Sequence, residues 1–213
     1  MNLFLATRDI PYEAFLNTGS SSEYGFKKEP MKETDYLEPN SIYSATKASS
    51  TYFGQVLSHD YNKPIVTIRP FSVYGPYESK GRLISNIMIA LIKNRPIYLS
   101  PGEGKHDFIY IDDLIGGYAA VIKNINKVIG RIINLGTTKE YTNSEVVEKL
   151  FQVAKKRVNV NKDSAPKRMW DSPHWSANID IARTLLQWQP KFNIHTGIEQ
   201  TYKWFTKNIN LYD

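Results

Sequence analysis

The sequence predicts an α/β protein in which a parallel sheet lies between two layers of helices. Short runs of apolar, β-branched residues alternate along the chain with segments long enough for helices, which is the pattern of strand–helix–strand units. The clearest run is Pro-Ile-Val-Thr-Ile-Arg-Pro at 64–70, whose apolar character is typical of a strand buried on both faces. Polar turns follow several of these runs, at the end of the strands where open parallel sheets place their ligands.

Composition sets the outer limits. The chain has 213 residues, 41% of them hydrophobic, which suffices for one sizeable core or one domain with a smaller attachment. The absence of cysteine excludes disulfides and thiol catalysis, and the four histidines show no metal-ligand spacing, so we expect no metal. Because no apolar run could span a bilayer and the N-terminus lacks a signal pattern, we expect a soluble, cytoplasmic protein without a membrane partner.

The net charge of +6 could attract either nucleic acid or an anionic small molecule. The basic residues are dispersed and form no stripe interleaved with aromatic side chains. We therefore expect no nucleic-acid partner and interpret the charge as a solvated positive surface that helps to attract an anionic substrate.

Local signals define the elements of the first hundred residues. Pro11 ends the first helix, the glycine and serines at 19–22 break the first strand, and Ser41 is suited to cap a long helix. Phe53, Val56 and Leu57 form an apolar stripe on that helix. The predicted elements are, in order, a helix over 1–8, a strand over 15–18, a polar turn over 19–22, a loop over 23–40, a helix over 42–61, a strand over 64–70, a turn over 71–76, a helix over 83–93 and a strand over 97–99.

Capping signals dominate the second half. Asp112 and Asp113 suit the N-terminus of a helix, and Thr142 followed by Glu145 has the pattern of a capping box. Pro190 separates the last two helices. The predicted elements are a turn over 100–104, a strand over 108–111, a helix over 112–121, a strand over 131–135, a turn over 136–138, a helix from about 142, a helix over 180–186 and an amphipathic helix over 195–209.

Tyr43 and Lys47 lie four residues apart on the predicted helix over 42–61, so their side chains share one face. A tyrosine hydroxyl, with an ordinary pKa of about 10, is a poor base at neutral pH. An ammonium beside it favours the phenolate and moves the pKa toward the pH at which proton transfer is most effective. The pair therefore indicates proton transfer, although this spacing alone also occurs in many helices by chance.

Several motifs occur in an order and at spacings that resemble one family. They are Ser-Glu-Tyr-Gly at 22–25, Tyr-Ser-Ala-Thr-Lys at 43–47, Arg-Pro-Phe-Ser-Val-Tyr-Gly-Pro at 69–76, His-Asp-Phe-Ile-Tyr-Ile-Asp-Asp at 106–113 and Leu-Gln-Trp-Gln-Pro at 186–190. Together with Ser20, they resemble the extended short-chain dehydrogenase/reductases, and specifically the NAD-dependent nucleotide-sugar epimerase/dehydratase family, across nearly the whole chain.

This resemblance implies an incomplete Rossmann-like, three-layer parallel sheet with a small C-terminal α/β substrate-binding part. The family's first strands and their Gly-rich turn have no counterpart, and the sequence contains neither G-x-G-x-x-G nor G-x-x-G-x-x-G. We expect residues 1–135 to be the C-terminal portion of the NAD-binding domain with interwoven substrate segments, and residues 136–213 to be mainly the substrate-binding part. The strand over 15–18 would then be an exposed sheet edge.

The resemblance also implies a catalytic set of Ser20, Tyr43 and Lys47. Tyr43 would exchange a proton with a sugar hydroxyl while hydride passes to or from the nicotinamide of NAD or NADP. Lys47 would lower the tyrosine pKa and bind the nicotinamide ribose, and Ser20 would bind the same sugar oxygen. The implied cofactor-binding residues are Thr18, Tyr43, Lys47, Pro70, Phe71 and Val73, and the implied substrate-binding residues are Ser21, Ser22, Ser72, His106 and Asp171.

Departures from the family pattern narrow the chemistry. Dehydratases of the family carry an Asp-Glu pair directly after the catalytic Ser or Thr, whereas Ser21 and Ser22 stand there, so we expect an epimerase or 4-ketoreductase. His106 replaces the usual arginine before Asp107 and lacks its bidentate fork, which predicts weaker affinity for a diphosphate. Ser72 replaces the usual asparagine.

The expected partners are a nucleotide diphosphate sugar and a second copy of the chain, packed through the helix that carries Tyr43. The absence of a Gly-rich turn predicts impaired cofactor binding. A non-catalytic nucleotide-sugar-binding or oligomerising remnant of the family is therefore the alternative function. The nucleotide, the sugar, and the choice between NAD and NADP stay open at this point.

Overall fold

A three-stranded parallel sheet forms the centre of the larger part of the molecule. The computed structural model describes residues 2–101, 104–162, 164 and 172–213. The strands are β1 (Phe15–Thr18), β2 (Ile65–Pro70) and β6 (Ile132–Leu135), in the order β1-β2-β6. Residues 65–69 of β2 are buried, because β2 is the central strand and has helices on both faces. The predicted buried parallel strand is thereby confirmed.

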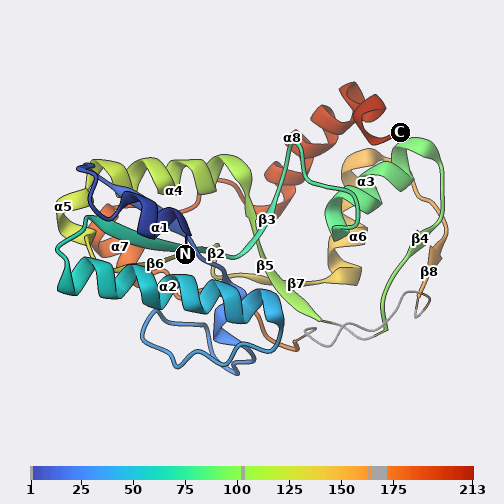
Figure 1. The fold of residues 1–213 in the computed structure, drawn as a ribbon. Helices are drawn as coiled ribbons and strands as arrows, with labels where there is room; N and C mark the ends of the chain where they lie inside the picture. Colours follow the sequence, from blue (N-terminus) through green and yellow to red (C-terminus); the bar gives the residue numbers. More distant parts are fainter. Residues whose placement is uncertain (1, 102–103, 163, 165–171) are drawn as a thin grey trace.

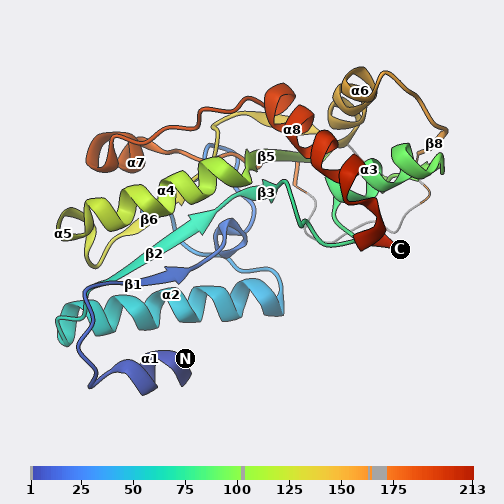
Figure 2. The same cartoon turned by 90° about the horizontal axis from the view of Figure 1, so that it is seen from above.

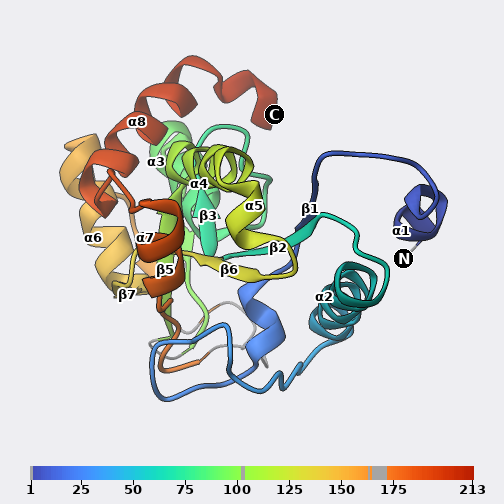
Figure 3. The same ribbon diagram turned by 90° about the vertical axis from the view of Figure 1, so that its left-hand side faces the viewer.

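Helices cover both faces of this sheet. The long helix α2 (Ile42–Asp60) lies on one face, with α1 (Asn2–Thr7) beside it. Helices α4 (Ile111–Lys123) and α7 (Asp180–Leu186) lie on the opposite face (Figures 1, 2 and 3). This arrangement confirms the three layers that the sequence predicts.

A second group of elements packs beside the first sheet. Strands β3 (Ser72–Tyr74) and β5 (Lys105–Tyr110) pair in parallel, and β7 (Glu140–Thr142) pairs antiparallel with β5. Further along, β4 (Ile97–Tyr98) pairs with β8 (Val160–Asn161). The helices of this group, which Figure 1 shows on the right, are α3 (Leu83–Lys93), α6 (Asn143–Ala154) and α8 (Ile194–Lys207).

Each part has its own hydrophobic core. One core surrounds the first sheet and includes Val66, Ile68 and Trp188, and the other lies among α3, α6 and α8 and includes Met88 and Phe205. Both cores draw residues from before and after residue 135, because the chain crosses between the parts several times. The division at residue 135 stays a prediction.

Caps explain where the best-predicted helices begin. Ser41 caps α2, where its Oγ accepts a hydrogen bond from the backbone N–H of Ser44. Thr142 and Glu145 form the predicted capping box at the start of α6. The helix predicted over 180–186 has those bounds in the structure, and the helices predicted over 42–61 and 195–209 begin or end within two residues of the prediction.

Three local predictions need correction. The turn expected over 71–76 contains β3, because the chain passes from β2 into a second sheet, where residues 72–74 pair in parallel with residues 108–110 of β5. The polar turn at 19–22 runs into a short 3₁₀ helix, η1 (Ser21–Tyr24). Asp113 does not cap its own helix, because its buried carboxylate accepts the backbone N–H groups of Lys191 and Phe192 at 2.8 and 2.9 Å.

Short elements complete the chain. Helix α5 (Ile125–Val128), strands β7 and β8, and the C-terminal 3₁₀ helix η2 (Ile209–Tyr212) were not predicted. Within the described residues, β1 pairs with β2 alone, so its other edge is unpaired, as expected. None of the described helices is both long and apolar enough to cross a membrane.

Candidate active site

A cleft of about 1020 Å³ opens at the carboxyl ends of β1 and β2. It extends from the end of the first sheet to the second group of elements, reaching α3 and β4. Every predicted site residue within the described part of the chain lines this cleft. They are Thr18, Ser20, Ser21, Ser22, Tyr43, Lys47, Pro70, Phe71, Ser72, Val73 and His106. Asp171 lies outside the described residues.

Ser20 is positioned by the transition from β1 to η1. It is the N-cap of η1, and its Oγ accepts a hydrogen bond from the backbone N–H of Ser22 at 3.2 Å. The two hydroxyl oxygens of Ser20 and Ser22 lie 2.8 Å apart. The predicted catalytic serine therefore stands at the strand end, in a hydrogen-bonded turn on the cleft wall.

Helix α2 brings Tyr43 and Lys47 to the same wall. The Lys47 Nζ atom lies 5.8 Å from the centroid of the Tyr43 ring, as expected for neighbours one turn apart. Lys47 also donates a hydrogen bond to the backbone carbonyl of Thr18 at 2.8 Å, which ties α2 to the end of β1. Tyr43 is 58% exposed, so its hydroxyl is accessible to a ligand in the cleft.

The far wall of the cleft is aromatic. The ring of His106 on β5 lies 5.8 Å from that of Phe108 and 6.5 Å from that of Trp175, measured between centroids. Trp175 Nε1 donates a hydrogen bond to the Oγ of Ser21 at 3.1 Å. Ser21 is therefore a buried link between two cleft walls as well as a lining residue.

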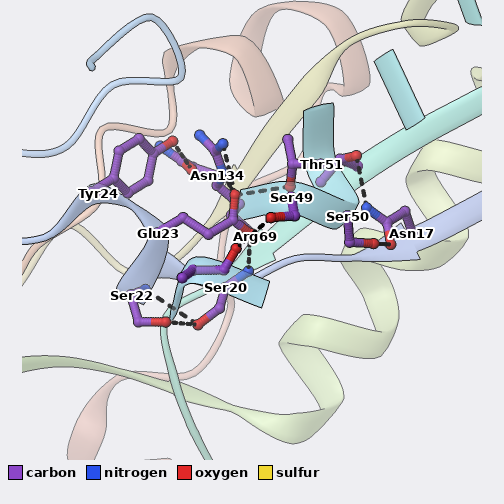
Figure 4. Close-up of polar contacts among 12 residues, drawn as sticks. Asn17, Ser20, Ser22, Glu23, Tyr24, Ser49, Ser50, Thr51, Arg69 and Asn134 are labelled. Carbon is purple, nitrogen blue, oxygen red and sulfur yellow. Dashed lines mark hydrogen bonds and ion pairs between the residues drawn. The ribbon is translucent and has the colours of Figure 1, made fainter. Parts of the chain in front are cut away.

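Beneath Ser20, the carboxylate of Glu23 is withdrawn from the cleft. Glu23 and Arg69 are both fully buried and form an ion pair of 2.8 Å. Figure 4 shows this pair together with the serines of η1 and the hydroxyl residues of α2. The sequence shows Glu23 only as an acid close to the serines, and nothing in its local pattern reveals the buried partner.

Three cations line the cleft on either side of α3, and they were not predicted from the sequence. Lys80, Arg82 and Arg95 line the cleft there, together with Glu78. The signal is weak in the sequence, because the residues belong to two separate loops at either end of α3. Lys80 donates a hydrogen bond to the backbone carbonyl of Asp213, and Arg82 Nε lies 3.7 Å from Glu78 Oε1. Among the described residues, no cluster of three or more His, Asp or Glu side chains could hold a metal ion.

The fold and this site together define a class of protein. A serine that follows one parallel strand and a Tyr-x-x-x-Lys helix line the same cleft at the carboxyl edge of a Rossmann-like sheet. Residues 1–136 match the model of the NAD dependent epimerase/dehydratase family. The chain belongs to that family.

Similar proteins include several nucleotide-sugar epimerases. UDP-glucuronate 4-epimerase of Thermodesulfobacterium geofontis is 30% identical over 99% of this chain and 65% of its own length. UDP-glucuronate 4-epimerase 4 of Arabidopsis thaliana is 29% identical over 92% of this chain and 48% of its own. The structure of UDP-glucuronic acid 4-epimerase from Bacillus cereus with UDP-glucuronic acid and NAD superposes with a TM-score of 0.88, 28% identity and coverage of 96% and 65%. The chain thus spans from about half to two thirds of these relatives.

Proposed function

We propose that this chain carries the catalytic and sugar-binding machinery of a nicotinamide-dependent nucleotide-sugar epimerase or 4-ketoreductase. The observation that carries the proposal is the placement of Ser20, Tyr43 and Lys47 on one wall of a single cleft. The hydrogen bond from Lys47 to the carbonyl of Thr18 holds the Lys47 ammonium beside the Tyr43 ring. The relative position of the two side chains is therefore fixed before a ligand binds.

The cleft suits the nicotinamide end of a dinucleotide. Thr18, Pro70, Phe71 and Val73 line it next to Tyr43 and Lys47, offering an apolar surface beside polar groups. When bound, the nicotinamide accepts or returns the hydride of a sugar carbon. The B. cereus epimerase with NAD among the similar structures favours NAD over NADP.

The proton chemistry belongs to the chain's own residues. Tyr43 takes the proton of a sugar hydroxyl during oxidation and returns it during reduction. The Lys47 ammonium stabilises the phenolate by charge, and Ser20 donates a hydrogen bond to the same sugar oxygen. Hydroxyls of Ser22 and Ser72, both on the cleft wall, hold the sugar ring.

A nucleotide diphosphate sugar is the proposed substrate class. Lys80, Arg82 and Arg95 line the same cleft as Tyr43, and their charges would neutralise an anionic diphosphate. His106 also lines the cleft. UDP-glucuronate is the first compound to test, because two of the relatives are UDP-glucuronate 4-epimerases.

Elimination of water is disfavoured by the position of Glu23. A dehydratase needs an acid and a base beside the sugar, but Ser21 and Ser22 carry no carboxylate, and Glu23 is buried and paired with Arg69. A buried carboxylate that already accepts several hydrogen bonds cannot serve a ligand in the cleft. The site therefore favours epimerisation or keto reduction.

Binding without turnover is the second candidate. It is favoured by the absence of a Gly-rich phosphate-binding motif from these 213 residues. We also propose a homodimer in either case, because α2 exposes Tyr52 and Val56 on its outer face.

The test compares the unaltered chain with Tyr43→Phe in the presence of UDP-glucuronate and NAD. We expect the unaltered chain to form the 4-epimer and Tyr43→Phe to lose about a hundredfold or more in turnover, the usual contribution of a general acid–base group. Calorimetry should show the same affinity for UDP-glucuronate within about threefold, because tyrosine acts on the proton rather than on binding.

Tyr36→Phe is the matched control, since Tyr36 is an exposed tyrosine that lies outside both the cleft and the face of α2 proposed for the dimer. Equal turnover by the unaltered chain and Tyr43→Phe would contradict the proposed chemistry. Binding of UDP-glucuronate with no turnover by the unaltered chain would establish the second candidate instead.

A further inference from the structure

We propose that Glu23 is a positioning residue. It fixes the position of Ser20 relative to α2, the helix that carries Tyr43 and Lys47. This inference rests on the proposed function, because it assigns Glu23 a role in the same reaction. Glu23 does not line the cleft, so we place its effect on the reaction through Ser20.

The two carboxylate oxygens of Glu23 bind in different directions. Oε1 accepts the backbone N–H of Ser20 at 2.7 Å. Oε2 accepts the hydroxyl of Thr51 on α2 at 2.8 Å and the Nε–H of Arg69 on β2 at 2.9 Å (Figure 4). One side chain thus joins the catalytic serine, the catalytic helix and the central strand.

Burying the Glu23–Arg69 ion pair is energetically unfavourable compared with burying two apolar side chains. Both side chains are fully buried, and removing two charges from water is unfavourable unless their geometry is good. The guanidinium carbon lies 4.5 Å from the centroid of the Tyr24 ring, and the Tyr24 hydroxyl donates to Asn134 at 2.7 Å. Within the described part of the chain, Arg69 Nη1 has no hydrogen-bond partner. Two apolar side chains could fill this space without the loss of hydration energy. We therefore interpret the pair as one that fixes the local conformation around Ser20.

The backbone at Gly19 packs directly against the carboxylate of Glu23. A Cβ atom at residue 19 would lie 2.5 Å from Glu23 Oε1 and 3.2 Å from the Cγ of Arg69. Glycine is therefore the residue that lets the backbone before Ser20 approach the buried carboxylate. The approach brings the Ser20 N–H within reach of Oε1.

Helix α2 is tied to the same strand ends by two further contacts. Ser50 donates a hydrogen bond to Asn17 on β1 at 3.0 Å, and Lys47 donates to the carbonyl of Thr18 at 2.8 Å. Thr51 adds the contact that reaches Ser20 through Glu23. Since a misplacement of about 1 Å in a catalytic group can cost about a hundredfold in rate, such a tie has a direct catalytic value.

The first experiment measures the exchange of the Ser20 amide proton by NMR in the whole chain, after labelling serine and isoleucine with ¹⁵N. The exchange rate of the Ser20 amide is divided by that of Ile68, a buried β2 residue whose amide reports global unfolding. We expect this ratio to rise about tenfold in Glu23→Gln, because the hydrogen bond loses its charge, and about threefold or more in Thr51→Val, which keeps the ion pair.

Thr201→Val is the matched control, because Thr201 is also a fully buried helical threonine whose hydroxyl is hydrogen-bonded, to Gly197, far along the chain. Its ratio should equal that of the unaltered chain. If Glu23→Gln does not fold, the exchange ratio in Thr51→Val tests the proposal by itself. An unchanged ratio in Thr51→Val would overturn the proposal.

The second experiment is a double-mutant cycle on turnover of UDP-glucuronate with NAD. Thr51→Val should lower kcat about tenfold with KM unchanged within about threefold, and should lower it no further when Ser20 is already alanine. An equal loss in both backgrounds would show that Thr51 acts on the fold rather than through Ser20. If the unaltered chain neither binds nor converts the sugar nucleotide, the proposed function fails, while the exchange experiment still decides the position of Ser20.

Discussion

Glu78 is a largely buried carboxylate that lines the cleft just before the start of α3. It accepts the backbone N–H of Ser85 at 2.9 Å and so serves the N-terminus of α3, where Arg82 provides no side-chain cap. Its own backbone carbonyl accepts the hydroxyl of Tyr212. Burial raises the pKa of Glu78 to about 7, although Arg82 and the Ser85 N–H act in the opposite direction.

This raised pKa predicts that the fold becomes less stable as the pH rises from acid to neutral. The folded chain binds the Glu78 proton more tightly than the unfolded chain does, so the stabilising contribution is complete below the ordinary pKa of 4.5 and is lost as the pH rises through about 7. Between about pH 5 and pH 8, the free energy of unfolding should therefore fall by about 1–3 kcal/mol more in the unaltered chain than in Glu78→Gln.

Urea denaturation at a series of pH values measures this difference. Glu148→Gln is the control, since Glu148 is an exposed acid on α6, paired with Arg157. It should leave the pH dependence of stability as it is in the unaltered chain. Parallel curves for the unaltered chain and Glu78→Gln would rule out the assignment.

Among the elements, α4 offers a matched pair of adjacent glycines. A Cβ atom at Gly117 would lie 2.4 Å from Leu135 Cδ1, in the core under β6, whereas a Cβ atom at Gly116 would meet nothing closer than Trp188 Nε1 at 3.7 Å. Gly117→Ala should therefore lower the free energy of unfolding by about 1–3 kcal/mol through overpacking. Gly116→Ala should raise it by up to about 1 kcal/mol, because alanine is the better helix former. Denaturant titration distinguishes them, and equal effects of the two changes would contradict the close packing of α4.

Helix α2 carries the second prediction at this scale. The sequence assigned Val56 to an apolar stripe with Phe53 and Leu57. The structure buries Leu57 but leaves Val56 50% exposed, because the buried face of α2 passes through Ala48, Thr51 and Leu57. If a second copy covers the exposed face, Val56→Glu should convert a dimer of 24.5 kDa chains into a monomer.

Light scattering during size-exclusion chromatography gives the mass. Ile122→Glu is the matched control, because Ile122 is 56% exposed on α4, across the sheet from α2. It should leave the mass unchanged. A monomeric unaltered chain, or dissociation by both changes alike, would refute a dimer through α2.

At the scale of the whole molecule, charge sets the response to salt. The chain carries a net charge of +6, and Lys80, Arg82 and Arg95 bring part of it to the cleft. The Kd for UDP-glucuronate should therefore rise about tenfold between roughly 0.02 and 0.5 M NaCl, because salt screens exposed charges. Calorimetry with uridine, which has no phosphate, is the control and should show little change. A salt-independent Kd for UDP-glucuronate would show that Lys80, Arg82 and Arg95 do not contribute to binding of this ligand.

What the sequence determined by itself lies within short stretches of chain. Capping residues located the starts of the helices at 42 and 143, because the signals for a helix end lie within one turn of it. The shared face of Tyr43 and Lys47 followed from helical periodicity alone. The place of the cleft at the carboxyl ends of the strands followed from the parallel α/β pattern.

Only the tertiary structure decided which distant segments meet. Strands β3, β7 and β8 are two or three residues long and exist because partners far along the chain lie opposite them. The buried pair of Glu23 and Arg69 joins residues 46 positions apart. No neighbouring residue carries information about a partner at such a distance, since long-range pairing depends on how the whole chain packs.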